Sequence, residues 1–158
     1  LIDIAVSHMS AAETFGSGLA LQILNVNSVP AAGGGSQVQI EFSATDGAGQ
    51  AITNPSGMAF AATVGWPVTE FEHYVREAIV NANGNPPPGT LVNNNNGTYA
   101  YTFAATFDDS SPVTYAVGME GRRPFMTDEG VTMNQGTSTN GMMNFTLNGS
   151  KGVEQRRI

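Results

Sequence analysis

A run of aromatic residues at every second position constrains the fold of this chain more than any other feature. Tyr99, Tyr101 and Phe103 alternate with small or polar residues. Because successive side chains of a β-strand point to opposite faces, the three rings are predicted to lie on one buried face of a strand over 98–106. The dipeptide Asn96-Gly97, which favours a tight turn, comes directly before this strand. The pattern is typical of antiparallel β-structure.

A second alternating run follows over 113–121, after a polar break that contains Asp108 and Asp109. Two strands so close in sequence predict an antiparallel hairpin. Tyr115 stands near the beginning of the second strand, just after the polar corner. In Greek-key sandwiches a tyrosine at that place donates a hydrogen bond from its hydroxyl to the backbone upstream, and we expect the same of Tyr115.

Composition favours a single all-β domain. The 158 residues include nineteen glycines and eight prolines, and only 12% of them are charged. Such a chain is rich in turns and poor in helices with charged outer faces. A chain of this length buries roughly two-thirds of its unfolded surface, enough for one core without disulfide bonds. About seven alternating runs separated by turn residues predict an immunoglobulin-like antiparallel β-sandwich with Greek-key connections.

We expect the sandwich domain to span 18–150. Residues 1–17 are predicted to form a tail or an edge strand, and residues 151–158 a linker strand toward a further C-terminal module. The segments 81–97 and 127–141 are rich in Asn, Gly, Pro or Thr, so we expect long polar loops there.

One segment carries a different pattern from the rest of the chain. Apolar side chains recur at helical spacing within 69–80, and Thr69 with Glu72 has the form of an N-terminal capping box. The residues themselves therefore predict a helix of about three turns, inserted among the strands.

The charge of the chain excludes several classes of partner. The formal net charge is −7 and the only lysine is Lys151, so neither nucleic acid nor an anionic membrane surface is an expected partner. Residues 1–121 hold ten acidic and one basic side chain, a charge of −9, whereas residues 122–158 hold three acidic and five basic ones, a charge of +2. The basic end of an acidic body indicates a surface on which something docks.

Residue types that carry chemistry are scarce. The chain has no cysteine, which excludes disulfides, thiol catalysis, cysteine-ligated zinc and covalent attachment of haem c. His8 and His73 have no second ligand at metal-site spacing, and no nucleophile has a base beside it, so we predict no catalytic site and no metal centre. Asp108 and Asp109 are weak candidates for calcium ligands. The seven methionines are expected to fill gaps in the core.

Aromatic residues support an alternative function. Trp66 and Tyr74, together with Tyr99 and Tyr101, are of the kind that form platforms for sugar rings. The alternate placement of Tyr99 and Tyr101 favours the core instead. A carbohydrate-binding or adhesion module of a bacterial surface protein is therefore the second interpretation of the sequence.

Three stretches of the chain resemble a known family. They are VQIEFSATDGAG at 38–49, NGTYAYTF at 96–103 and YAVGMEG at 115–121. Together they resemble the N-terminal β-domain of outer-surface multihaem c-type cytochromes of the OmcA/MtrC type. The terminal residues 155–158 resemble the strand that leads, in that family, into the first Cys-x-x-Cys-His segment. The family pattern also makes 71–79 a strand where the spacing of side chains predicts a helix.

The resemblance implies a function for the parent protein and a more limited one for this chain. The parent is expected at the bacterial cell surface, where it moves electrons to extracellular acceptors such as metal oxides or soluble shuttles. Haem c belongs to a C-terminal module that this chain lacks. The chain itself is then a non-catalytic scaffold that docks on the haem-bearing module, and on other surface proteins, without inserting into the membrane. Four residues are expected to meet haem propionates or the next domain: Arg122, Arg123, Arg156 and Arg157.

Overall fold

The computed structural model describes residues 18–110, 112–127, 129–137 and 141–147. These residues form nine strands and no helix, so no helical membrane span is found among them. The strands are β1 (Ala20–Pro30), β2 (Ser36–Thr45), β3 (Ala59–Trp66), β4 (His73–Val80), β5 (Thr90–Asn93), β6 (Thr98–Phe107), β7 (Thr114–Met126), β8 (Thr132–Gly136) and β9 (Met142–Thr146).

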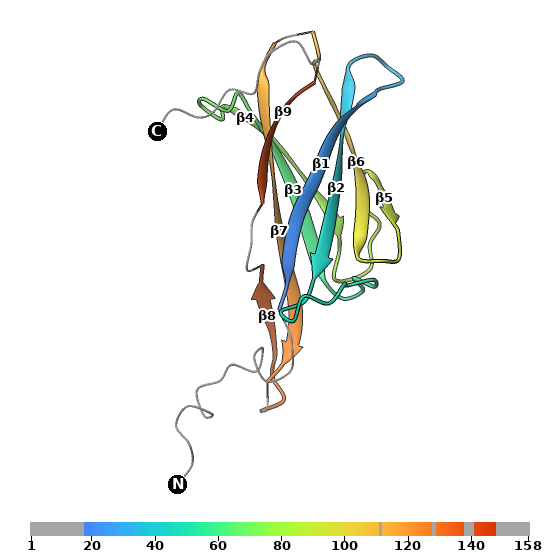
Figure 1. Cartoon of the computed structure of the whole chain (residues 1–158), viewed down its shortest axis with the longest axis vertical. Coiled ribbons are helices and arrows are strands. Elements are labelled where there is room, and N and C mark those ends of the chain that lie inside the picture. The colour runs from blue at the N-terminus through green and yellow to red at the C-terminus, as the bar shows by residue number, and fades with distance from the viewer. Residues whose placement is uncertain (1–17, 111, 128, 138–140, 148–158) are drawn as a thin grey trace.

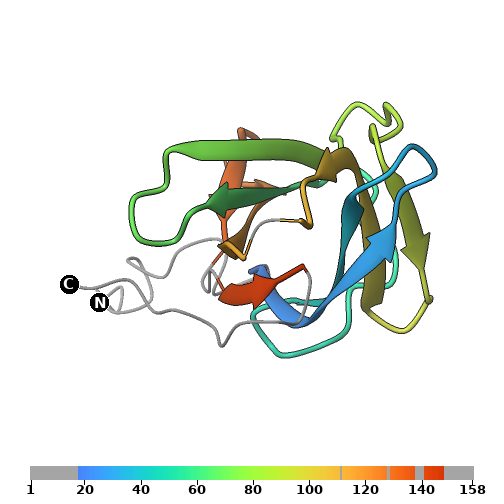
Figure 2. The ribbon, with the colours of Figure 1, turned by 90° about the horizontal axis from the view of Figure 1, so that it is seen from above.

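The strands form two antiparallel sheets that pack against each other (Figures 1 and 2). The first sheet has the order β1-β2-β6-β5, and the second has the order β4-β3-β7 with β8 and β9 on the far edge of β7. β9 pairs with the first half of β7 and β8 with its second half. The predicted all-β sandwich is thus confirmed. Its immunoglobulin-like character and the domain limits 18–150 stay predictions, and the segments 1–17 and 151–158 lie outside the described residues.

The core lies between the two sheets and is built from alternate residues, as the sequence predicts. In β6 the side chains of Tyr99, Tyr101 and Phe103 are at most 1% exposed. The ring of Phe42 from β2 stacks on that of Tyr99 with a centroid distance of 5.2 Å. Because removal of apolar surface from water is the main favourable term in folding, these alternating side chains determine which face of each strand turns inward.

β6 and β7 do not form the predicted hairpin. β6 pairs with β2 and β5, whereas β7 pairs with β3, β8 and β9. Each strand already has neighbours on both edges, so the polar corner between them crosses from one sheet to the other. The hydroxyl of Tyr115 donates a hydrogen bond to the backbone oxygen of Asp108 at 3.0 Å, which confirms the bond expected for this tyrosine.

The predicted helix over 69–80 is also wrong. β4 occupies His73–Val80 and pairs with β3, so the strand implied by the resemblance is confirmed here. Only one turn precedes it, in which the backbone nitrogen of Phe71 donates to the oxygen of Pro67 at 2.7 Å. Glu77 occupies an inward position of the strand and is 7% exposed. This charged residue interrupts the apolar alternation and leaves helical spacing as the clearer pattern.

Three of the nine strands lie where the pattern of side chains predicts none: β4 in place of the helix, and the two short strands β5 and β8. β5 lies within 81–97 and β8 within 127–141, the segments predicted to be loops. β8 is mainly polar and mostly exposed, and β5 has only four residues, half of them exposed. Neither strand is long or apolar enough to show the alternation by which strands are recognised.

The carboxylate of Glu77 joins the two sheets. It accepts hydrogen bonds from the hydroxyl of Tyr101 at 2.6 Å and from the backbone nitrogens of Ala104 and Ala105 at 3.0 Å each. These two nitrogens lie where β6 bulges away from β2. The Tyr101 hydroxyl also accepts a hydrogen bond from the backbone nitrogen of Gly89 at 2.9 Å. A buried carboxylate is tolerated because hydrogen bonds replace its lost hydration.

Candidate docking surface

The second half of β7 extends beyond the body of the sandwich. The last residue of β7 that pairs with β3 is Arg122, and from there β7 pairs with β8 alone. We call the segment Arg122–Gly136 the projecting hairpin. Figure 1 shows it reaching past the ends of β1 and β3. A two-stranded ribbon is at best marginally stable in water, and packing against a partner would stabilise it.

The projecting hairpin carries exposed apolar side chains. Met126 is 63% exposed, Val131 54% and Met133 52%. Phe125, directly opposite Met133, is partly buried. Exposed apolar side chains often mark interaction sites, and methionine adapts its shape to a partner. Met126 lies on the face of β7 that carries Arg122, whereas Met133, opposite Phe125, lies on the other face of the ribbon. The expectation that the methionines fill the core is wrong for these two, because the hairpin leaves the sandwich before it reaches them.

The four arginines predicted to dock differ in their surroundings. Arg123 donates a hydrogen bond from Nη1 to the backbone oxygen of Gly18 at 3.0 Å, and so ties the hairpin to the chain that enters β1. Arg122 is exposed on the other face of the ribbon. Arg156 and Arg157 lie outside the described residues. The structure therefore leaves Arg122 as the described arginine of this set whose side chain is exposed.

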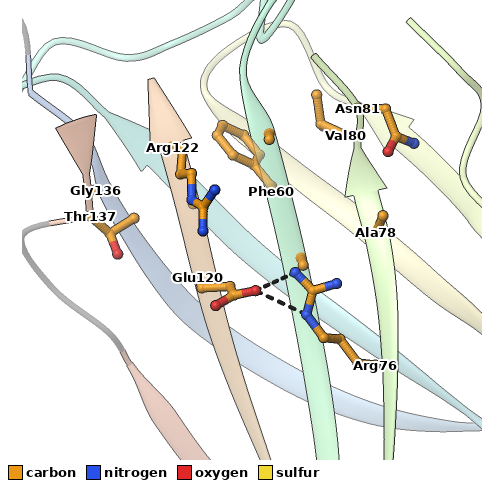
Figure 3. A pocket seen from close by; sticks show the side chains of 12 residues that line it. Phe60, Arg76, Ala78, Val80, Asn81, Glu120, Arg122, Gly136 and Thr137 are labelled. Atoms are coloured by element: carbon orange, nitrogen blue, oxygen red, sulfur yellow. Dashed lines mark hydrogen bonds and ion pairs between the residues drawn. The ribbon is translucent and has the colours of Figure 1, made fainter. Parts of the chain in front are cut away.

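Arg122 borders a groove of about 460 Å³ on the outer face of the second sheet (Figure 3). Ala61 and Ala78 contribute small side chains to the lining of the groove. The Nε of Arg76 donates to Oε1 of Glu120 at 2.9 Å, and Figure 3 shows this ion pair crossing the lower part of the groove. Two guanidinium groups against one carboxylate leave a local charge of about +1, which suits a ligand or partner with a carboxylate.

The structure does not bring Trp66 and Tyr74 into one aromatic platform. The ring of Trp66 lies 5.5 Å, between centroids, from each of the rings of His73, Phe107 and Tyr115. Tyr74 follows His73 in β4 and therefore points to the opposite face of the second sheet, where it is 74% exposed. One sugar ring cannot stack on both side chains from a single face.

The two aspartates of the polar corner are engaged by hydroxyl groups. Ser110 donates to Oδ1 of Asp108 from its backbone nitrogen at 2.9 Å and from its hydroxyl at 2.6 Å, and these bonds lower the pKa of Asp108. The hydroxyl of Ser36 donates to Oδ2 of Asp109 at 2.7 Å. Among the described residues, no three His, Cys, Asp or Glu side chains are placed to hold a metal ion together, and His8 lies outside these residues. Calcium binding stays a prediction.

No protein-family model and no curated protein sequence matches the chain. Among solved structures, MtrC from Shewanella baltica OS185 matches with a TM-score of 0.52 and 22% identity, over 88% of this chain and 24% of that one. The chain has the fold of part of MtrC. The outer membrane decaheme cytochrome OmcA matches with a TM-score of 0.44 and 17% identity, again over 88% of this chain and 24% of the other.

The comparison confirms the resemblance inferred from the sequence at the level of fold. The chain spans 24% of the length of either cytochrome that it matches. Its residues do not fit haem c. The sequence contains no cysteine for thioether attachment, and His73, the histidine among the described residues, packs against Trp66.

Proposed function

We propose that this chain is the haem-free, non-catalytic β-domain of an extracellular multihaem cytochrome, in which it serves as scaffold and docking domain for the haem-bearing part. The observation that carries the proposal is the fold shared with part of MtrC. Electron transfer to extracellular acceptors then belongs to the remainder of the parent protein. A location at the outer cell surface is part of the same proposal.

The projecting hairpin and the groove beside it supply the docking surface. Arg122 offers a planar guanidinium group, which binds carboxylates with two parallel hydrogen bonds. Haem propionates and acidic side chains of the next module are groups of that chemistry. Met126 adds apolar contact on the face of Arg122, and Met133 adds it on the other face of the ribbon, so a partner would contact both faces. Arg123 holds the hairpin to the body through Gly18.

The composition of the parent protein tests the proposal most directly. We expect the protein purified from its source to have a mass well above 16.5 kDa and a Soret absorption band. The 158-residue chain produced alone has neither. A source protein of the same mass as this chain, or one without haem, would exclude the proposed function.

A titration tests the docking surface separately. The chain is mixed with the haem-bearing remainder of the parent, and the affinity is measured by calorimetry. Arg122→Ala should weaken binding roughly tenfold, since a charge-assisted contact is lost. Gln22→Glu on β1 is the matched control, because it changes the net charge by the same amount on the other sheet. If Arg122→Ala and Arg123→Ala together leave the affinity unaltered, the arginines have no docking role.

A further inference from the structure

The outer edge of β4 is unpaired within the described part of the chain. The backbone hydrogen bonds of β4 run to β3, and none joins it to another described element. The other edge strands are less able to pair. β5, β8 and β9 have four or five residues, while β1 contains a shift of register and ends in Pro30. β4 has eight residues and no proline. Such an edge pairs readily with another strand.

We propose that β4 pairs antiparallel with β4 of a second copy of this chain, about a twofold axis at Val75. In this register Val75 lies opposite its own copy, Tyr74 lies opposite Arg76, and His73 lies opposite Glu77. The five residues belong to the regular part of the strand, because the register between β3 and β4 shifts only beyond Ala78. The pairing does not depend on the proposed function.

The sequence of β4 favours this register over its neighbours. Residues directly opposite each other in an antiparallel pair lie on the same face of the sheet. The twofold axis must therefore lie at a residue and not midway between two residues, so the nearest alternative registers place it at a neighbouring residue. An axis at Arg76 brings two guanidinium groups together, and an axis at Glu77 brings two carboxylates together. Like charges directly opposite destabilise a pair of strands. An axis at Tyr74 leaves only three residues of β4 within the shared ladder.

The side chains on the outer face are complementary in the proposed register. Tyr74 is 74% exposed, which is unusual for so large a ring with no partner in the described part of the molecule. Opposite it lies Arg76, whose guanidinium reaches over β3 to Glu120. The ring of one copy would cover the aliphatic stem and the exposed side of that guanidinium, and this contact would occur twice about the axis.

Single cysteines test the register, because the chain has no cysteine of its own. Residues directly opposite in an antiparallel pair have Cα atoms about 4.5 to 5.5 Å apart, within reach of a disulfide. We expect Val75→Cys to form a covalent dimer under mild oxidation. Ala78→Cys is the control, since its two copies would lie roughly 20 Å apart along the strands. Fluorescence of Trp66 shows whether each variant is folded.

Sedimentation of the unmodified chain over a range of concentrations tests the association itself. We expect a reversible dimer, which Tyr74→Ser weakens roughly tenfold. Leu24→Ser removes an exposed apolar side chain from the edge strand β1 and should leave the dimer unchanged. A chain that stays monomeric at every concentration overturns the proposal. Cross-linking of Ala78→Cys or Tyr74→Cys as fast as Val75→Cys overturns the register.

Discussion

Two strands of this domain leave the ladder of their sheet, and they end in opposite surroundings. Where β6 bulges away from β2, the freed backbone nitrogens of Ala104 and Ala105 are bonded by the carboxylate of Glu77. Where β7 passes Arg122, it continues as a ribbon with β8 whose methionines are exposed. The first departure is completed inside the molecule. The side chains at the second remain exposed.

The contrast separates stability from recognition. Changes where Glu77 bonds the bulge of β6 should lower the free energy of unfolding. They should leave docking intact as long as the domain is folded. Changes on the projecting hairpin should do the reverse, because its side chains contribute little to the core. The variants described next each change one of these two regions.

The largest effect is expected from Glu77→Ala. The substitution leaves the Tyr101 hydroxyl and two backbone nitrogens without their acceptor. Loss of such a buried acceptor costs about 3 to 5 kcal/mol of the free energy of unfolding, measured by urea denaturation. Glu120→Ala is the matched control, since its ion pair with Arg76 is exposed and worth at most about 1 kcal/mol. Equal losses of unfolding free energy in the two variants would show that the hydrogen bonds of Glu77 do not stabilise the sandwich.

Alkaline pH should lower the free energy of unfolding through the tyrosines of the same interior region. Burial raises the pKa of the Tyr101 hydroxyl above its ordinary value of 10.0, and the hydrogen bond to Glu77 raises it further. Burial also raises the pKa of Tyr99 and Tyr115. The native state then retains protons that the unfolded chain releases, so stability is complete below pH 10 and falls as pH rises toward the raised values.

Urea denaturation between pH 8 and about pH 11 measures this dependence. Tyr101→Phe should make the decline less steep, although it also removes one donor to Glu77 and lowers stability at neutral pH. A free energy of unfolding that is the same at both ends of the range would show that the tyrosines titrate alike in the folded and unfolded chain.

A smaller effect is expected from Tyr115→Phe in the buried half of β7. The variant keeps the ring among its aromatic neighbours and loses only the hydrogen bond to the oxygen of Asp108. The cost should be about 1 kcal/mol. Comparison of urea midpoints with Tyr74→Phe gives the control, because the hydroxyl of that exposed tyrosine has no described partner. If Tyr115→Phe loses no more stability than Tyr74→Phe, the hydrogen bond of Tyr115 does not stabilise the domain.

The sequence predicts the interior of this molecule better than its edges. Alternation in β2 and β6 locates the core face, since burial of apolar side chains enforces a period of two residues. The hydroxyl bond of Tyr115 follows from its place after the polar corner. The same reasoning fails in β4 because of Glu77. A charged residue at a core position looks like an outward one until its partners, twenty or more residues away in β6, are known.

The docking surface is harder to predict for a related reason. Arg122 and Arg123 are adjacent in sequence and belong to opposite faces of β7, yet charge counting treats them alike. The polar composition of β8 predicts a loop, so nothing in the sequence indicates a ribbon that carries Met126 and Met133 out of the core. β8 is a strand because it pairs with β7, and such pairing cannot be predicted from the residues of β8 alone.

The smallest effect on stability, and the sharpest test of the contrast, is expected from Met133→Ser. The side chain is 52% exposed, so the free energy of unfolding should change by no more than about 0.5 kcal/mol. Binding to the haem-bearing remainder should nevertheless weaken several-fold, whereas Leu24→Ser on β1, 46% exposed, should leave it unchanged. Both variants replace an exposed apolar side chain of similar size with serine, so the main difference between them is the position of the change. If both variants bind alike, the projecting hairpin is ordinary surface and the groove must carry docking by itself.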